Sequence, residues 1–219
     1  YLNRNYHTKN LQIKVRNTQA FRTKLRLPPA KQAPLLGMIT RLTEQKGLDL
    51  LLPIIPNIIK TGAQLAVLGS GDGDLEKRLQ QLAKLHPTHI SVTIGYDEEL
   101  AHQIEAGANM FLMPSKFEPC GLNQMYSMRY GTIPIVRRTG GLADTVVDAT
   151  YDNIQNKIAT GFVFEKADSE ELLSCVQRAL RTFRDKTTWR MLQINGMNRD
   201  FSWHKSAKQY VSLYHQLLN

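Results

Sequence analysis

The most constraining feature of this chain is a series of short apolar runs, each followed by a stretch with helical periodicity. The runs are apolar at nearly every position, so both sides of each strand are expected to be covered, as in parallel sheets. Strands that alternate with helices predict an α/β, Rossmann-like, doubly wound parallel sheet. The expected strands are 35–40, 64–69, 90–95, 110–114 and 132–136.

Helices are expected between these strands and at the end of the chain. The periodicity places them at 47–60, 74–85, 98–107, 121–130, 168–184, 187–199 and 203–218, with a short strand at 161–164. Pro53 and Pro56 interrupt the first helical pattern. The expected organisation is a polar, basic lead-in segment at 1–33, a Rossmann-like domain at 34–200 and a C-terminal helix at 201–219.

Length and composition suit a globular protein of 219 residues, 42% of them hydrophobic. No run of eighteen apolar residues occurs and no secretion leader is visible, so no membrane contact is expected. The chain begins with Tyr1 rather than Met, so a fragment is expected. Cys120 and Cys175 lie far apart and form no metal-type spacing, which favours a reducing cytoplasm and no metal site.

The net charge of +9 raises the question of a nucleic-acid partner. The basic residues are scattered, form no run of five and accompany no aromatic-rich nucleic-acid motif. We therefore expect a basic surface and no nucleic-acid partner, with a few cations available for a phosphate.

In a doubly wound sheet the ligand lies at the carboxyl ends of the strands, so the loops after the strands carry the information. Arg41 and Lys46 flank a turn after the first strand, before a helix whose N-terminus favours anions. They form either a diphosphate clamp or two solvated surface cations. The turn at 69–74 (GSGDGD) is neither G-x-G-x-x-G nor a Walker motif, so a dehydrogenase or ATPase site is poorly supported.

The remaining loops are ambiguous one at a time. Tyr96 could stack on a base or cap the core. Glu118 follows the fourth strand, where a surface glutamate is the ordinary alternative, and Gly121 is expected to start a helix. The turn at 139–141 (Thr-Gly-Gly) exposes backbone N–H groups before a helix. Several such loops at one edge together favour a phosphate-bearing ligand.

The residues of these loops also resemble a known family. The segments RLTEQKGLD (41–49), GYDEE (95–99), PSKFEPCGLNQMYSMRYGTIPIVRRTGGLADTV (114–146) and TGFVF (160–164) resemble bacterial glycogen synthases, and DFSW (200–203) extends the likeness. These are retaining glucosyltransferases of the GT-B fold, related to plant starch synthases. The 114–146 stretch is the specific part. The resemblance implies the carboxyl-terminal half of such an enzyme, because nothing matches the K-x-G-G-L motif of the amino-terminal half.

The resemblance implies glucose transfer from ADP-glucose to the non-reducing end of an α-1,4-glucan. Arg41 and Lys46 match the basic pair that holds the diphosphate, and Glu118 matches the acidic residue beside the transferred glucose. These three are the expected catalytic residues, with no cofactor beyond the substrate. The expected donor-binding residues are Tyr96, at the adenine, Cys120, Gly121 and Leu122 in the Glu118 loop, and Thr139, Gly140 and Gly141, at the distal phosphate or sugar.

The resemblance also implies partners for the chain, and alternative functions remain open. The chain should bind the donor but not turn over alone, and its last helix should cross back to the missing N-terminal domain. Tyr126 stands where many relatives carry the second glutamate of E-x7-E, as expected of the glycogen synthase branch. The rivals are a related GT-B enzyme using UDP-glucose or another acceptor, a non-catalytic nucleotide-sugar-binding module and a nucleic-acid binder.

Overall fold

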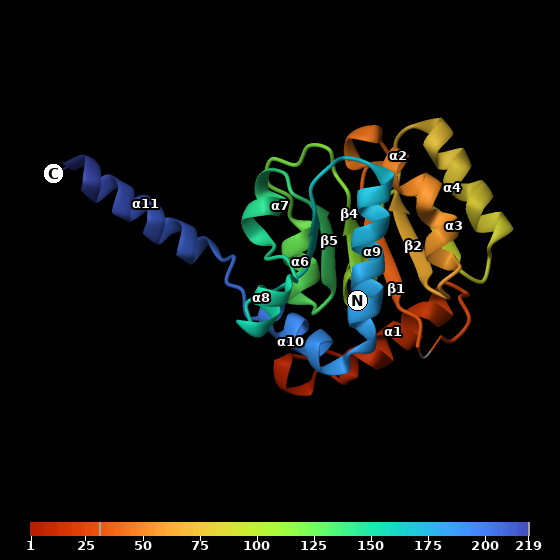
Figure 1. Cartoon of the computed structure of the whole chain (residues 1–219), viewed down its shortest axis with the longest axis horizontal. Coiled ribbons are helices and arrows are strands. Elements are labelled where there is room, and N and C mark those ends of the chain that lie inside the picture. Colours follow the sequence, from red (N-terminus) through yellow and green to blue (C-terminus); the bar gives the residue numbers. More distant parts are fainter. Residues whose placement is uncertain (31, 219) are drawn as a thin grey trace.

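The computed structural model describes residues 1–30 and 32–218, and its centre is one parallel sheet (Figure 1). The strand order β3-β2-β1-β4-β5-β6 is that of a doubly wound sheet, which confirms the predicted fold class. The observed strands agree with the predicted ones to within one residue at each end. They are β1 (Leu35–Ile39), β2 (Gln64–Gly69), β3 (Ile90–Ile94), β4 (Met110–Met113), β5 (Ile133–Arg137) and β6 (Phe162–Phe164).

Helices cover both faces of this sheet because successive strand residues point to opposite sides. Leu35 belongs to one apolar cluster and Leu36 to the other, and both side chains are fully buried. On the Leu36 face lie α2 (Leu48–Leu51), α3 (Ile55–Ile59), α4 (Gly73–Leu85) and α9 (Ser169–Arg184). On the Leu35 face lie α5 (Glu98–Gly107), α6 (Asn123–Arg129) and α7 (Gly140–Thr145).

Capping side chains fix where several helices begin. Asp72, Asp97 and Asp168 each accept a hydrogen bond from a backbone N–H in the first turn of α4, α5 and α9. Asp185 does the same for α10 (Lys186–Met197), and Thr150 for α8 (Tyr151–Gln155). The helix predicted at 47–60 is instead α2 and α3 separated by a 3₁₀ turn (Leu52–Ile54), because its two prolines lack a backbone N–H.

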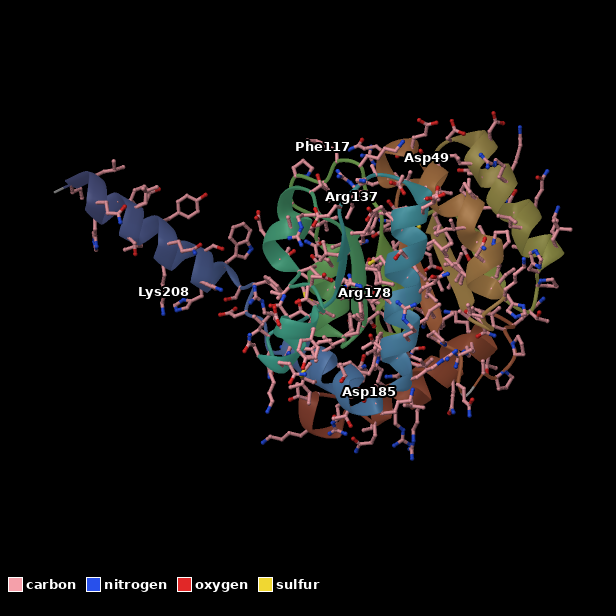
Figure 2. All side chains as sticks on the ribbon, viewed as in Figure 1. Asp49, Phe117, Arg137, Arg178, Asp185 and Lys208 are labelled. Carbon is pink, nitrogen blue, oxygen red and sulfur yellow. The ribbon has the colours of Figure 1, made fainter. Side chains whose placement is uncertain are left out.

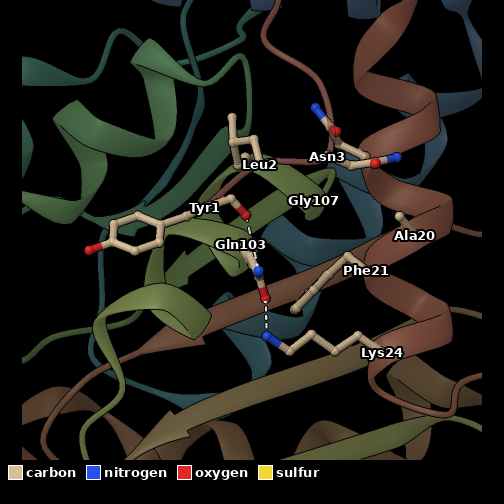
Figure 3. Close-up of a pocket in the computed structure, with 10 residues that line it drawn as sticks. Tyr1, Leu2, Asn3, Ala20, Phe21, Lys24, Gln103 and Gly107 are labelled. Atoms are coloured by element: carbon tan, nitrogen blue, oxygen red, sulfur yellow. Dashed lines mark hydrogen bonds between the residues drawn. The ribbon is translucent and has the colours of Figure 1, made fainter.

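The segment before β1 contains a helix that the sequence pattern did not reveal, α1 (Ile13–Lys24), preceded by a 3₁₀ turn (Thr8–Asn10). It packs against α5. Gln103 of α5 accepts a hydrogen bond from Lys24 Nζ (2.7 Å) and donates one to the Tyr1 carbonyl (3.0 Å), beside a pocket of about 340 Å³ (Figure 3). The buried side of α1 includes Lys14 and Arg22, so the apolar periodicity that identifies most helices is missing.

The last helix, α11 (Trp203–Leu218), has no buried residue and extends away from the sheet (Figure 1). Its helical state agrees with the prediction, whereas its contact with a missing domain stays a prediction. The division of the chain at residues 33 and 200 also stays a prediction. Among the described residues, no helix combines the length and the apolar character needed to cross a membrane.

Candidate functional site

A crevice opens where the chain connections of the sheet change direction, between β1 and β4. The β1–β4 ladder consists of two residue pairs, Leu36 with Met110 and Gly37 with Phe111. Such switch points are where doubly wound sheets bind ligands. The crevice has a volume of about 200 Å³. It is lined by Met38, Ile39, Thr40, Arg41, Lys46, Leu112, Met113, Ser115, Glu118, Gly121, Leu122 and Asn123.

An ion pair between two loops lies in this crevice. Lys46 Nζ, from the loop after β1, lies 2.6 Å from Glu118 Oε2, from the loop after β4. Their side chains are only 16% and 11% exposed, so both charges are largely removed from water. Ser115 Oγ donates a second hydrogen bond to the same carboxylate oxygen (3.1 Å). The structure thus brings together two of the expected catalytic residues, and exposed Arg41 lines the same crevice.

The backbone of these two loops is hydrogen-bonded, which explains how residues so distant in sequence meet. Lys116 N donates to the Gln45 carbonyl (2.8 Å), and Lys116 Nζ pairs with Asp49 Oδ2 (2.6 Å). Gly47 has a φ of 76°, and a Cβ there would overlap the Pro114 carbonyl oxygen. Figure 2 shows Asp49 at the same end of the molecule as Phe117 and Arg137.

The Thr139-Gly140-Gly141 turn packs directly on the Glu118 loop. A Cβ at Gly140 would overlap the Glu118 carbonyl oxygen, and a Cβ at Gly141 would overlap that of Cys120. The Gly141 N–H donates to the carbonyls of Glu118 and Pro119, at 3.1 Å each. The sequence predicts that the amides of this turn meet a phosphate. The Gly141 N–H already donates to carbonyls of the chain, so it is not free to donate to a phosphate in this structure.

The other expected donor-binding residues lie around the crevice at different distances. Gly121 and Leu122 line it, and Leu122 is the N-cap of α6. Cys120 is an exposed free thiol whose Sγ donates to the Gly121 carbonyl (3.5 Å). Tyr96 follows β3 and is 87% exposed, outside the crevice lining, as is Thr139, the N-cap of α7. Their roles at the donor stay predictions.

The loop after β2 joins the same edge. Leu42 N donates to the Ser70 carbonyl (2.9 Å), and Asp72 N donates to the Leu42 carbonyl (2.8 Å). The predicted gathering of loops after strands one, two, four and five is therefore present as direct backbone contacts.

Three residues that sequence reasoning passed over also shape the site. They are Ser115, described above, Asn123 and Arg137. Asn123 donates from Nδ2 to the Ile39 carbonyl (3.0 Å) and connects α6 to the end of β1. Arg137 donates from Nε to the Ser115 carbonyl (3.0 Å), from Nη2 to that of Lys116 and from Nη1 to that of Glu165 (3.3 Å). Ser115 follows β4 and Arg137 ends β5, so the rule that located Glu118 could have found these two, whereas Asn123 is the first residue of α6 and that rule does not point to it.

The arrangement places two cationic side chains and one carboxylate in the lining of the same crevice. Arg41 and Lys46 supply fixed positive charge, and Glu118 can accept hydrogen bonds from hydroxyl groups. Within residues 1–30 and 32–218, no three His, Cys, Asp or Glu side chains gather as a metal site would require.

Comparison with known proteins gives a consistent family assignment. The model of the family described as "Glycosyl transferases group 1" matches residues 21–188. The chain is 50% identical to glycogen synthase 1 of Methylococcus capsulatus and 51% identical to the glycogen synthase of Nitrosospira multiformis. Each match covers 100% of this chain but 44% of the relative, so the chain spans less than half the length of these relatives. The resemblance to bacterial glycogen synthases is thus confirmed.

Solved structures agree in fold. The catalytic domain of starch synthase IV from Arabidopsis thaliana, bound to ADP and acarbose, superposes with a TM-score of 0.90 at 39% identity, covering 98% of this chain and 45% of that one. Sucrose-phosphate synthase from Thermosynechococcus elongatus gives 0.67 at 26% identity, covering 91% and 49%. Because the family model matches most of this chain, and because its sheet is of the GT-B type, the chain belongs to the glycosyl transferases group 1 family.

Proposed function

We propose that this chain is the donor-binding domain of a retaining glucosyltransferase that moves glucose from ADP-glucose to the non-reducing end of an α-1,4-glucan. The observation that carries the proposal is the Lys46–Glu118 pair beside Arg41 at the switch point of the sheet. Phosphate-binding cations next to a sugar-binding carboxylate are what a nucleotide-sugar donor requires. The high identity to glycogen synthases supports this donor class.

In the proposed mechanism, charge separates between the departing diphosphate and the sugar. Arg41 and Lys46 stabilise the negative charge that grows on the leaving ADP, which is the kind of preorganised electrostatics that dominates many enzymes. Glu118 binds sugar hydroxyls and favours positive charge growing at the anomeric carbon. Retention of configuration places the acceptor hydroxyl on the same face as the leaving group, with the phosphate accepting its proton.

The adenine end of the donor is assigned to the far side of the crevice. We place the base at Tyr96, whose exposed ring follows β3, and the distal phosphate or glucose near the Thr139-Gly140 turn. The ADP named with the starch synthase IV structure favours an adenine nucleotide over a uridine nucleotide.

The remainder of the enzyme is proposed to supply the glucan acceptor site. The exposed apolar side chains of α11, among them Trp203 and Tyr214, suit contact with an amino-terminal domain across the cleft. On this view the chain alone binds ADP but does not transfer glucose. We place the enzyme in the cytoplasm, where the free thiols of Cys120 and Cys175 stay reduced.

Calorimetric titration with ADP and with UDP tests the donor assignment. We expect weak ADP binding by the chain, weaker UDP binding, and loss of ADP binding in Arg41→Ala. Arg181→Ala is the matched control, since Arg181 is an exposed arginine of α9 that does not line the crevice. Equal responses of the two variants, or no heat with either nucleotide, would refute the proposal.

A further inference from the structure

A second, larger cavity lies away from the crevice, between α1, the loop after α1 and α10, and we call it the α1–α10 cavity. Its volume is about 750 Å³, within the range of small-molecule sites. It includes Asn109, which directly precedes β4, so the cavity lies at the amino ends of the strands. Figure 2 shows Asp185, the residue between α9 and α10, at the opposite end of the molecule from Asp49 and Arg137.

The wall of this cavity is partly apolar. Leu11, Leu27, Phe183 and Trp189 contribute to it, and each of these side chains is at least nine-tenths buried. Phe183 and Trp189 meet edge to face with their ring centroids 5.1 Å apart, so one side of the cavity is a rigid aromatic surface. Such a surface suits a ligand with an apolar or aromatic body.

The charge of the cavity wall has one sign. Among the described residues that line it, four are Lys or Arg and none is Asp or Glu. Lys186 and Arg190 are exposed on α10, at the solvent side, whereas Lys14 and Arg22 of α1 are 3% and 6% exposed. A concave surface lined by one sign of charge concentrates the field and favours an anion.

The two buried cations are bonded only to neutral oxygens. Lys14 Nζ donates to the Ala106 carbonyl (2.6 Å) and to Thr132 Oγ1 (2.7 Å). Arg22 donates from Nε to Gln64 Oε1 (2.7 Å) and from Nη2 to the Ala33 carbonyl (2.7 Å). Neither forms an ion pair with a carboxylate of the described residues.

Two other shielded cations of this chain, in contrast, form ion pairs with carboxylates. Lys46 is paired with Glu118, and Arg178 with Asp148 at 2.7 Å. Burial of a charge without a counter-charge is costly. In keeping with that, burial lowers the pKa of Lys14 to about 7 and also lowers the pKa of Arg22. Arg22, whose Nη2 is bonded to the lining residue Ala33, is the buried cation that an anion in the cavity would approach.

We propose that the α1–α10 cavity binds a small organic anion that has an apolar or aromatic body. The site is separate from the nucleotide crevice and takes no part in glucose transfer, so the inference does not rest on the proposed function. The apolar wall takes the body, and the exposed cations Lys186 and Arg190 take the acidic group.

Fluorescent probes that differ only in charge test the inference on the full-length protein that contains this chain. The anionic probe is 8-anilinonaphthalene-1-sulfonate, and N-phenyl-1-naphthylamine is the same body without the sulfonate. The Lys186→Glu/Arg190→Glu variant reverses the two exposed charges and is expected to weaken sulfonate binding roughly tenfold or more. The neutral probe should bind this variant and the parent protein alike.

Two further variants keep the result specific to the cavity. Arg181→Glu/Arg184→Glu makes the same change of charge on exposed positions of α9 that do not line the cavity, and should bind the sulfonate as the parent does. Val15→Trp fills the cavity from the exposed side of α1 and should reduce binding of both probes. Equal weakening in both charge variants, or unchanged sulfonate binding in Lys186→Glu/Arg190→Glu or Val15→Trp, would overturn the inference. Circular dichroism and urea unfolding check that each variant is folded.

Discussion

Replacing one partner of the Lys46–Glu118 pair should lower the free energy of unfolding much more than replacing both. In Lys46→Met, Glu118 keeps a carboxylate that is mostly shielded from water and has lost its cation. We expect this variant to lose about 3 kcal/mol of unfolding free energy, the lower end of the range for a broken buried ion pair, because both side chains retain some exposure. In Glu118→Gln the ammonium is left without its carboxylate, and the double variant leaves neither charge.

The structure sets the size of the coupling. At 2.6 Å, with an effective dielectric constant of about 20, the attraction is roughly 6 kcal/mol before desolvation. Desolvation offsets much of this, so we expect a net coupling of about 1–3 kcal/mol in a double-mutant cycle. Lys24 and Glu99 form an exposed control pair at 2.9 Å, with side chains 47% and 52% exposed. For such a pair the expected coupling is about 0.2–1 kcal/mol.

Urea unfolding of the wild type and the six variants in the two cycles measures both couplings under one set of conditions. The expected result is a larger coupling at positions 46 and 118 than at 24 and 99, and one that added salt reduces less. If the two couplings are equal, the crevice pair is no more shielded than a surface pair and the electrostatic description of the site is wrong.

Two further predictions concern packing and pH. Gly141→Ala should displace the Glu118 loop and weaken ADP binding, because its Cβ would overlap the Cys120 carbonyl; Gly73→Ala, with no atom within 4 Å of the added Cβ, is the control that should keep full ADP affinity by calorimetry. Burial raises the pKa of Glu105 to about 7 from its ordinary value of 4.5, so the folded state favours the protonated acid and stability from this group is lost as pH rises. Wild type should lose about 2 kcal/mol more than Glu105→Gln between pH 5 and 7 in urea unfolding, and parallel pH profiles would contradict this.

The fold was predictable because its strands are apolar on both sides. The run QLAVLG (64–69), which forms β2, is buried at every position, whereas the edge strand β3 is fully buried only at Ile90. Helix α1 was not predictable by the same rule. Its buried face contains Lys14, Asn17 and Arg22, which are stabilised by tertiary hydrogen bonds that no local pattern contains.

The candidate site was predictable in its location but not in its internal contacts. Parallel strands end at one edge, which is enough to gather Arg41, Lys46 and Glu118. That Lys46 would pair with Glu118 does not follow from the sequence, since it depends on the register of two loops 72 residues apart. Likewise, the glycines at 140 and 141 looked like phosphate-binding amides, whereas the structure gives a steric reason for them in the carbonyls of the Glu118 loop.

The ion pair has a consequence for how strongly the crevice can hold a donor. Lys46 and Glu118 neutralise each other at contact distance, so the positive charge left over in the crevice lining is that of Arg41. A diphosphate carries negative charge on each of its phosphates, and binding it requires Lys46 to share its charge between the carboxylate and the phosphate. The chain alone should therefore bind ADP weakly. Glu118→Gln, which frees Lys46, should bind ADP more tightly even as it removes the carboxylate proposed to act on the sugar, and calorimetry showing weaker ADP binding would contradict this competition.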